Sequence, residues 1–398
     1  MVATALDELR RPTLWAIAVA FGAITMMWTT YNEYVPEFLR TVFGAPALLI
    51  ALLLTMDNLL GFFLEPLVGL VSDRTRTAWG KRLPWLMLAL PIGAIAFALI
   101  PLPIQALAPD ASEAARNQAY SPFAFAVIGM IAAMAITRTP TTTLMPDLIA
   151  PPHRAVAHGL IQMWAGIGGL GALYTGGWLI DAFGVSGPFW ASSIVMIMAL
   201  AWLWFMLHRH QAVDDGVPYT PNGLSQWRLV LVVALLWLGY LTVVNRLAPA
   251  GGLDEAQDGF LQKLWLVVFT VAALPSGLMR NTVQAVQLGI GILVVVLLLV
   301  LIVPGNTFIY ALFMGLGGVG WALVTVNSLP LLINAGPEGK NGRNTGLYYL
   351  AFALAGLVTP WLLRGISPTL GGATLWLAPL AWGVALALMW SRTTDRVR

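Results

Sequence analysis

The sequence predicts an all-helical integral membrane protein. Of its 398 residues, 59% are hydrophobic and only 10% are charged, whereas soluble domains carry about 25% charged residues. Apolar runs close to the ~20 residues that cross a bilayer recur along the whole chain. Segments of alternating polarity, which a membrane β-barrel requires, are not visible. We therefore expect a polytopic bundle of transmembrane helices.

Each apolar run is bounded by Pro, Gly or charged clusters and is interpreted as one span, which gives twelve. The spans are expected at about 14–38, 46–71, 83–103, 120–145, 155–179, 188–207, 227–246, 260–279, 284–303, 308–333, 344–363 and 371–391. An even count places both termini on one side of the membrane. Because fifteen of the 21 Lys and Arg then fall on that side, we expect both termini to be cytoplasmic.

Several function classes are disfavoured by what the sequence contains. The positive charges lie in short connections between spans, which is typical of topology signals rather than of a nucleic-acid surface. The chain has no cysteine, and we find no nucleophile, metal-binding or nucleotide-binding motif. We therefore expect neither an enzyme nor a bound cofactor or metal. The expected location is the cell membrane, or the inner membrane in a bacterium, with the chain as a monomer in the lipid bilayer.

A polar segment, 208–226, divides the chain into two halves of six spans each, 1–207 and 227–398. An internal repeat supports this division. The stretch that begins MPDLIAPPHRAVAHG matches LLINAGPEGKNGRNTG at a shift of 187 residues, which places Gly159 on Gly346 and Asp147 on Asn334. Parallel repeats of this kind are typical of transporters that bind a substrate between two bundles and rock one bundle against the other.

Two acidic residues lie inside the second span. Asp57 and Glu65 are eight residues apart, so on a helix they share one face, about 12 Å apart along the axis. An ionisable side chain within a membrane is costly and usually has a partner or a function. The fourth span contains Arg138. It either pairs with Glu65 or Asp57, as a fixed internal ion pair or a coupling partner, or donates hydrogen bonds to a substrate.

The connection after the second span reads GLVSDRTRTAWGKRLP, Gly69 to Pro84. An Asp at a helix end beside a basic cluster forms a charge-assisted network that can differ between two arrangements of the bundles. Anchoring by positive charge alone would explain the arginines but not Asp73 and Gly80. We assign an inner gate to Gly69, Asp73, Arg74, Gly80, Lys81, Arg82, Asp147 and Arg154.

The spacing of this connection resembles the cytoplasmic signature of the major facilitator superfamily. It is most similar to the glycoside-pentoside-hexuronide:cation symporters, in their bacterial sucrose-type branch. TMDNLLGFFLEPLVG (55–69), RTPTTTLMPDL (138–148) and the stretch from GVGWALVTVNSLP to GLYYL (318–350) share the resemblance. It implies the major facilitator fold, with two pseudo-symmetric six-helix bundles, and secondary active transport of a sugar by alternating access.

The resemblance also implies roles for the intramembrane charges. Glu65 precedes Pro66, and in melibiose-type symporters the residue before the matching proline is a carboxylate of the cation site. Glu65 is therefore the expected coupling group, with Asp57 as a second polar group. At Arg138 those symporters carry another acid. A cation there disfavours a sodium site, which needs oxygen ligands, and favours either a proton or no coupling cation at all.

Four further side chains are candidates for contact with a substrate. Asn32 and Asn327 are amides within spans, where they either line a cavity or bond between helices. Trp28 and Trp321 lie near mid-span, where an indole either stacks on a sugar or packs in the core. In the second half, Asn281 replaces the acid of the signature connection. The alternatives to sugar symport are carriage of an organic anion or drug, and a non-transporting membrane factor for pigment or lipid.

Overall fold

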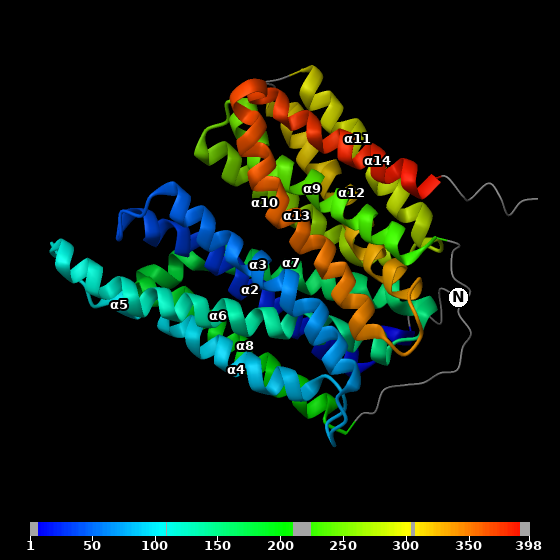
Figure 1. The fold of residues 1–398 in the computed structure, drawn as a ribbon, viewed down its shortest axis with the longest axis horizontal. Coiled ribbons are helices and arrows are strands. Elements are labelled where there is room, and N and C mark those ends of the chain that lie inside the picture. Colours follow the sequence, from blue (N-terminus) through cyan, green and yellow to red (C-terminus); the bar gives the residue numbers. More distant parts are fainter. Residues whose placement is uncertain (1–6, 109, 210–223, 304–306, 391–398) are drawn as a thin grey trace, which may run out of the picture.

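The computed structural model describes residues 7–108, 110–209, 224–303 and 307–390, and every regular element in these ranges is a helix (Figure 1). The long helices of the first half are α2 (Pro12–Thr41), α3 (Ala47–Arg74), α4 (Leu83–Leu99), α6 (Glu113–Leu148), α7 (Arg154–Phe183) and α8 (Gly187–Leu207). Those of the second half are α9 (Gln226–Gly251), α10 (Glu255–Gly277), α11 (Thr282–Ile302), α12 (Thr307–Asn334), α13 (Asn341–Leu370) and α14 (Leu377–Trp390). The short helices are α5 (Leu102–Gln105), η1 (Pro151–His153), η2 (Gly184–Ser186) and η3 (Gly371–Trp376).

The described residues contain eleven helical stretches that are long and apolar enough to cross a membrane. One of them, Pro151–Leu207, has 57 residues and contains both α7 and α8. These two helices are separated at Gly184, whose φ of +68° is a conformation that glycine adopts without strain. The prediction of an all-helical membrane fold with twelve spans is therefore confirmed.

Local sequence signals explain several helix starts. Pro12 lies in the first turn of α2, where its missing N–H removes no helical bond. The side chain of Ser112 accepts a bond from the backbone of Ala115 and begins α6 at Glu113, several residues before the predicted start. Asp254 forms a capping box with Gln257 at the start of α10.

The helices form two groups that meet at one end of the molecule (Figure 1). Helices α2 to α8 make the first bundle and α9 to α14 the second. The bundles converge at the end that carries residues 75–82, which we call the loop end, and diverge toward the opposite end. Residues 210–223 of the predicted linker lie outside the described residues, and the linker stays a prediction.

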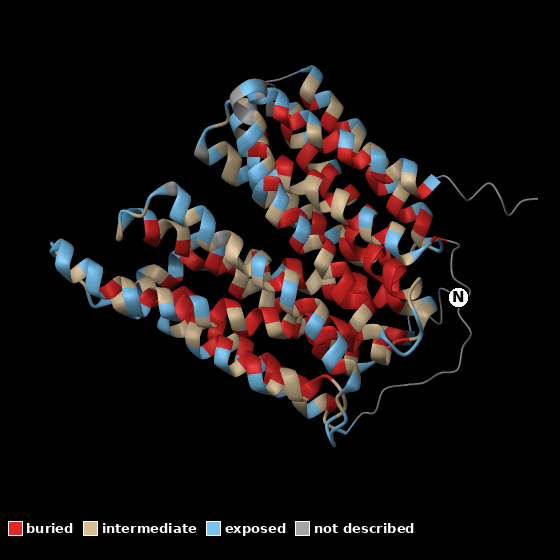
Figure 2. Cartoon of the chain, in the orientation of Figure 1, coloured by how far each residue is buried: buried red, intermediate tan, exposed pale blue. Residues whose placement is uncertain are grey.

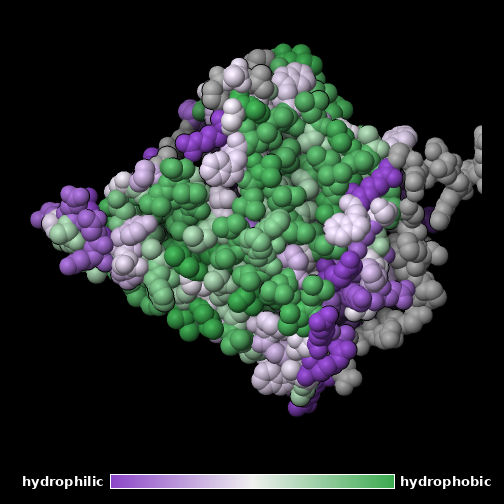
Figure 3. Space-filling model, in the orientation of Figure 1, coloured by the Kyte–Doolittle hydropathy of each residue, from purple (hydrophilic) through white to green (hydrophobic). Residues whose placement is uncertain are grey.

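Burial and hydropathy follow this arrangement. Buried residues concentrate where the bundles meet near the loop end (Figure 2). Apolar residues cover most of the visible surface, whereas hydrophilic residues gather at the loop end and at the tip formed by α5 and the start of α6 (Figure 3). A broad apolar belt between polar ends is the surface that a bilayer requires.

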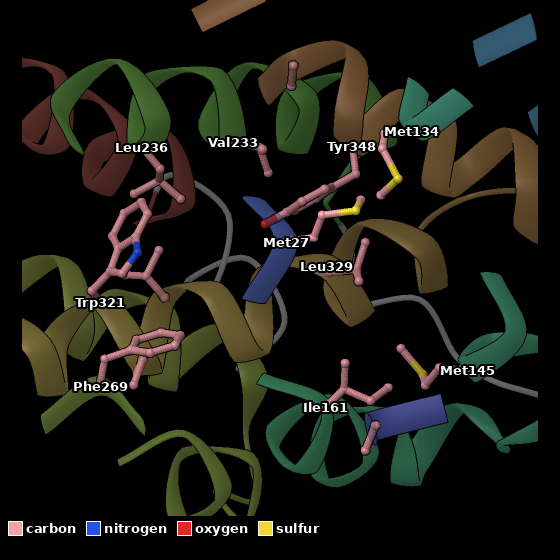
Figure 4. Packing of buried hydrophobic residues seen from close by; sticks show 14 of the residues in the cluster. Met27, Met134, Met145, Ile161, Val233, Leu236, Phe269, Trp321, Leu329 and Tyr348 are labelled. Carbon is pink, nitrogen blue, oxygen red and sulfur yellow. The ribbon is translucent and has the colours of Figure 1, made fainter. Parts of the chain in front are cut away.

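The apolar core contains side chains from both bundles. Figure 4 shows members of this core from the first half, Met27, Met134, Met145 and Ile161, and from the second half, Val233, Leu236, Phe269, Trp321, Leu329 and Tyr348. Small residues allow close approach where the bundles meet. A Cβ on Gly346 of α13 would lie 2.9 Å from the Glu65 carbonyl oxygen of α3. A Cβ on Gly159 of α7 would lie 2.8 Å from the Ala273 carbonyl oxygen of α10.

Candidate functional site

The structure brings the three intramembrane charges together. Arg138 of α6 donates from Nη1 to Glu65 Oε1 at 2.8 Å and from Nη2 to Asp57 Oδ2 at 3.4 Å. The eight-residue spacing on α3 places the two carboxyl groups on one face, and the guanidinium fork joins them. We call Asp57, Glu65 and Arg138 the charged cluster. Of the alternatives, pairing of Arg138 with an intramembrane acid is the one observed, and it engages both acids rather than one.

The members of the cluster differ in exposure. The side chain of Glu65 is fully buried, whereas those of Arg138 and Asp57 are 16% and 18% exposed. Gly61, one turn from each acid, leaves room for the carboxyl group, since a Cβ there would lie 3.2 Å from Glu65 Oε1. The buried Oε2 of Glu65 has no hydrogen-bond partner among the described residues. With all three groups ionised, the cluster carries one net negative charge.

Aromatic side chains surround the guanidinium of Arg138. Its central carbon lies 5.5 Å from the ring centre of Trp28, 5.9 Å from that of Tyr349 and 5.5 Å from that of Phe352. These distances allow cation–π attraction. Trp28 belongs to α2 and the other two rings to α13, so both bundles contribute. The hydroxyls of Tyr349 and Thr142 are 2.7 Å apart and form a further bond between the bundles.

At the loop end, Arg82 joins the ends of two helices of the first bundle. It donates from Nη2 to Asp73 Oδ1 at 2.5 Å and from Nε to Asp147 Oδ2 at 2.7 Å. Burial lowers the pKa of Arg82, but Asp147 and Asp73 outweigh burial and raise it above its ordinary value. Arg82 is therefore always charged, and it ties the end of α3 to the end of α6.

Asp73 also reaches the second bundle. Its Oδ1 accepts the backbone N–H of Gly342 at 2.9 Å, and its Oδ2 accepts that of Arg343 at 2.8 Å. These amides lie in the first turn of α13, where N–H groups lack helical partners and the helix dipole favours an anion. Asp73 therefore binds the backbone at the start of α13, and its ion pair with Arg82 keeps its carboxylate in position. Gly69 allows the approach, because a Cβ there would overlap the carbonyl oxygen of Gly342.

Two further contacts between the bundles are related by the repeat. Asn341 at the start of α13 donates to Asp147 Oδ1 at the end of α6, at 2.9 Å. Arg154 at the start of α7 donates from Nη1 to Asn334 Oδ1 at the end of α12. The shift of 187 residues places Arg154 on Asn341 and Asp147 on Asn334. The two contacts, Asn341 with Asp147 and Arg154 with Asn334, are therefore equivalent under the repeat, and each joins the bundles once.

The remaining predicted gate residues lie in the connection itself. Arg74 is exposed and Lys81 is half-buried, and neither belongs to the network around Asp73. Gly80 has φ +82°, which favours glycine and lets the chain turn into α4. Thr77 donates to the Gly80 carbonyl at 2.8 Å and closes this turn.

The other predicted substrate contacts are not part of the charged cluster. Asn327 is fully buried and donates to the carbonyls of Ser276 and Leu323, which makes it a bond between α12 and α10. Trp321 is 4% exposed and stacks on Tyr240, with ring centres 4.4 Å apart. Asn32 is exposed on α2. Their contact with a substrate stays a prediction, whereas Trp28 lies against the cluster.

Sequence reasoning missed Tyr349, Phe352 and the first turn of α13. Neither aromatic ring could be assigned to the site from a pattern, because α13 is apolar on several faces. Asn341 had a usable signal, since the repeat places it on Arg154, a predicted gate residue. The donors to Asp73 are backbone N–H groups, which nearly every residue has, so no residue type in the sequence indicates them.

Known proteins resemble the chain in sequence. The profile of the Major Facilitator Superfamily matches residues 3–170 and 114–360. An uncharacterised symporter of Synechocystis sp., sll1374, is 36% identical over 118 residues, which cover 29% of this chain and 21% of that protein. The inner membrane symporter YicJ of Escherichia coli is 36% identical over 63 residues, 16% of this chain and 14% of that protein. The matches thus span about a fifth or less of these relatives.

Solved structures resemble the chain over nearly its whole length. A bacterial homologue of the iron transporter ferroportin, in an outward-facing state, gives a TM-score of 0.72 at 16% identity, covering 95% of this chain and 98% of that one. The human organic anion transporter MFSD10 gives 0.71 at 16% identity, covering 95% of this chain and 99% of that one. The proton:xylose symporter XylE gives 0.70 at 13% identity, covering 95% of each chain. At these identities the likeness shows the fold. Because the superfamily profile also matches most of the sequence, the chain belongs to the major facilitator superfamily.

Proposed function

We propose that this transporter-family protein is a proton-coupled symporter for a glycoside or another small sugar. It would act as a monomer in the cell membrane, or the inner membrane of a bacterium, with both termini cytoplasmic. Its two bundles, 1–207 and 227–398, joined by the linker 208–226, would rock to give alternating access. The resemblance of its motifs to glycoside-pentoside-hexuronide:cation symporters and two partial relatives named as symporters support this proposal.

The observation that carries the proposal is the charged cluster. Arg138 bridges Asp57 and Glu65, so two carboxylates share one cation and one negative charge remains. A single bound proton would make the cluster neutral. Glu65 Oε2 is buried and has no partner among the residues described, which makes it the atom best suited to take that proton. Uptake and release of one proton would then change the pairing of Arg138.

The contacts at the loop end support alternating access. Asp73, Asn341 and Arg154 all form bonds that cross between the bundles there. Separation of the bundles at this end would break these bonds together and expose the polar groups to water. The bundles diverge at the opposite end (Figure 1). We interpret this arrangement as the one closed at the cytoplasmic gate.

The surroundings of Arg138 support a neutral ring as substrate. Trp28, Tyr349 and Phe352 offer aromatic faces that can stack on the apolar face of a sugar. An organic anion is less well supported, because both carboxylates already engage Arg138. A factor that only holds pigment or lipid is less well supported, because buried charges would serve no purpose in it.

The test is transport into vesicles of the purified protein, with a panel of disaccharides, with and without a proton gradient. One pH unit is worth about 1.4 kcal/mol per proton, or about tenfold accumulation. Glu65→Gln should reduce this accumulation to simple equilibration, because a neutral amide cannot take up and release the proton. Exchange of labelled for unlabelled sugar should persist.

Glu37→Gln is the matched control. Glu37 is a carboxylate at the end of α2 that pairs with Arg40 at 2.6 Å, and both side chains are largely exposed. Its loss should leave accumulation unchanged. A Glu65→Gln protein that still concentrates sugar against its gradient, with the pH dependence of the unmodified protein, would show that Glu65 is not the coupling group.

A further inference from the structure

Helix α12 contains a carbonyl group that lacks its usual donor within the helix. Pro330 lies inside α12 and has no N–H, so the carbonyl four residues earlier, that of Val326, loses its usual donor. Val326 is fully buried. A buried carbonyl without a partner is strongly unfavourable, so this position needs a donor from outside the helix.

His158 of α7 supplies that donor from the other bundle. Its Nδ1 lies 2.9 Å from the Val326 carbonyl oxygen. Because a carbonyl only accepts, Nδ1 carries the proton and donates it. The other ring nitrogen, Nε2, lies 3.0 Å from the side-chain nitrogen of Gln162, one turn along α7, and accepts from it in the neutral ring. His158 is 3% exposed, and each of its ring nitrogens has one hydrogen-bond partner.

The related position in the other half of the repeat is built differently. The shift of 187 residues places His158 on Thr345 and Pro330 on Thr143. The hydroxyl of Thr345 is buried without a hydrogen-bond partner in the described part of the chain. Thr139, which corresponds to Val326, has a carbonyl that accepts from the hydroxyl of Thr143 in its own helix. The histidine and the proline that creates its acceptor therefore occur together in one half only.

We propose that His158 is a positioning residue that stabilises the arrangement closed at the loop end, through its bond to the carbonyl that Pro330 leaves free. Between α7 and α12 it would have the role that Asp73 and Arg82 have between α3 and α13. This inference rests on the proposed alternating access. When the bundles separate at the loop end the bond breaks and water can reach the carbonyl, so the bond favours only the closed arrangement.

The test measures the distance between the bundles at the loop end. The chain has no cysteine, so spin labels can be attached at Ala78→Cys and Glu338→Cys, both at exposed positions on opposite bundles. The full-length protein is reconstituted in lipid nanodiscs. His158→Leu should raise the ratio of separated to closed molecules about five- to tenfold. His158→Asn should restore the original distribution, because its amide N–H can donate from nearly the place of Nδ1.

Removal of the proline provides the sharper comparison. Pro330→Ala gives the Val326 carbonyl a donor within α12, so His158→Leu on this background should change the ratio less than twofold. Thr345→Val is the matched control at the related position and should leave the distribution unchanged. An equal shift from His158→Leu with and without Pro330→Ala would overturn the proposal, because packing rather than this bond would then be responsible.

A second variant separates this inference from the proposed function. Asp73→Asn weakens the contact between α3 and α13 and should also shift the distribution. If Asp73→Asn shifts it and His158→Leu does not, the role of His158 is wrong and alternating access stands. If neither variant changes the distances, the bundles do not separate at this end, and both proposals fail.

Discussion

The two interfaces between the bundles, α3 against α13 and α7 against α10, have similar backbone packing but different chemistry. In the first, Gly69 lies against the carbonyl of Gly342. In the second, Gly277 lies against the carbonyl of Ala155. A shift of 208 residues places α3 on α10, and one of 187 residues places α7 on α13, so these contacts occupy equivalent positions.

The charged cluster belongs to the first interface. The same shifts place the members of the charged cluster, Asp57, Glu65 and Arg138, on Trp265, Ala273 and Thr325. At the loop end Asp73 falls on Asn281, and Arg82 falls on Ile290, which is fully buried and apolar. Close packing is thus shared by both halves, whereas the carboxylates that could couple transport to a proton are found in one. The difference predicts that the first interface senses protons and that the second only moves.

The largest expected effect comes from removing the cation of the first interface. Arg138→Thr introduces the residue of the second half and leaves two carboxylates without their partner. Breaking a buried ion pair in this way costs about 3–5 kcal/mol. Thermal unfolding of the purified protein should show a marked loss of stability, and the yield of folded protein should fall.

Removing all three charges of the cluster, with the second-half residues at positions 65 and 138, should reverse that loss. The triple variant Asp57→Asn, Glu65→Ala, Arg138→Thr has no uncompensated charge, so it should regain most of the stability while coupled uptake stays absent. If Arg138→Thr unfolds at the same temperature as the unmodified protein, the pairing with Glu65 and Asp57 contributes little to stability. The difference in charge between the two interfaces would then not matter for the fold.

An intermediate effect is expected from the glycines that the interfaces share. Gly69→Ala and Gly277→Ala would each place a Cβ against a backbone carbonyl of the other bundle, which cannot move aside alone. Each should disfavour the closed arrangement by about 1–3 kcal/mol, seen as a longer distance between labels at the loop end. Gly171→Ala is the control, because nothing lies within 4 Å of its Cβ position. A large effect from only one of the pair would show that the packing is not equivalent.

The sequence predicted the twelve spans well because a bilayer fixes the length of each apolar run. The repeat, read from Gly159 and Gly346, also indicated where backbones approach. The shared face of Asp57 and Glu65 follows from helical spacing alone. Pairing of Arg138 with one acid or the other could only be named among alternatives, and its pairing with both was not expected, because spacing within one helix does not fix the rotation of its neighbour.

What the sequence could not predict lies mostly between helices. The partners of Asp73 are backbone amides of α13, which any residue supplies. Asn327 and Trp321 were correctly located within α12, but a polar or aromatic residue at mid-span does not reveal which helix it faces. No sequence pattern singled out His158, and its acceptor becomes visible only when α12, with Pro330, is placed beside it in space.

The smallest effect is expected from restoring the missing acid of the second interface. Asn281 caps its own helix, since its Oδ1 accepts from the backbone of Val283 and Gln284 at the start of α11. Aspartate caps as well as asparagine does, and its charge is favourable at a helix start. Asn281→Asp should therefore change the stability by less than about 0.5 kcal/mol and leave the loop-end distance unchanged.

The reason is that Asp73 does not act alone. Arg82 holds Asp73 and Asp147 together, and Ile290 cannot do the same for an acid at position 281. An acid there would remain with its own α11 rather than reach the start of α7. If Asn281→Asp instead shifts the molecules toward the closed arrangement, the acid by itself makes the contact. Arg82 would then be only a counter-charge, and the difference between the interfaces would reduce to a single residue.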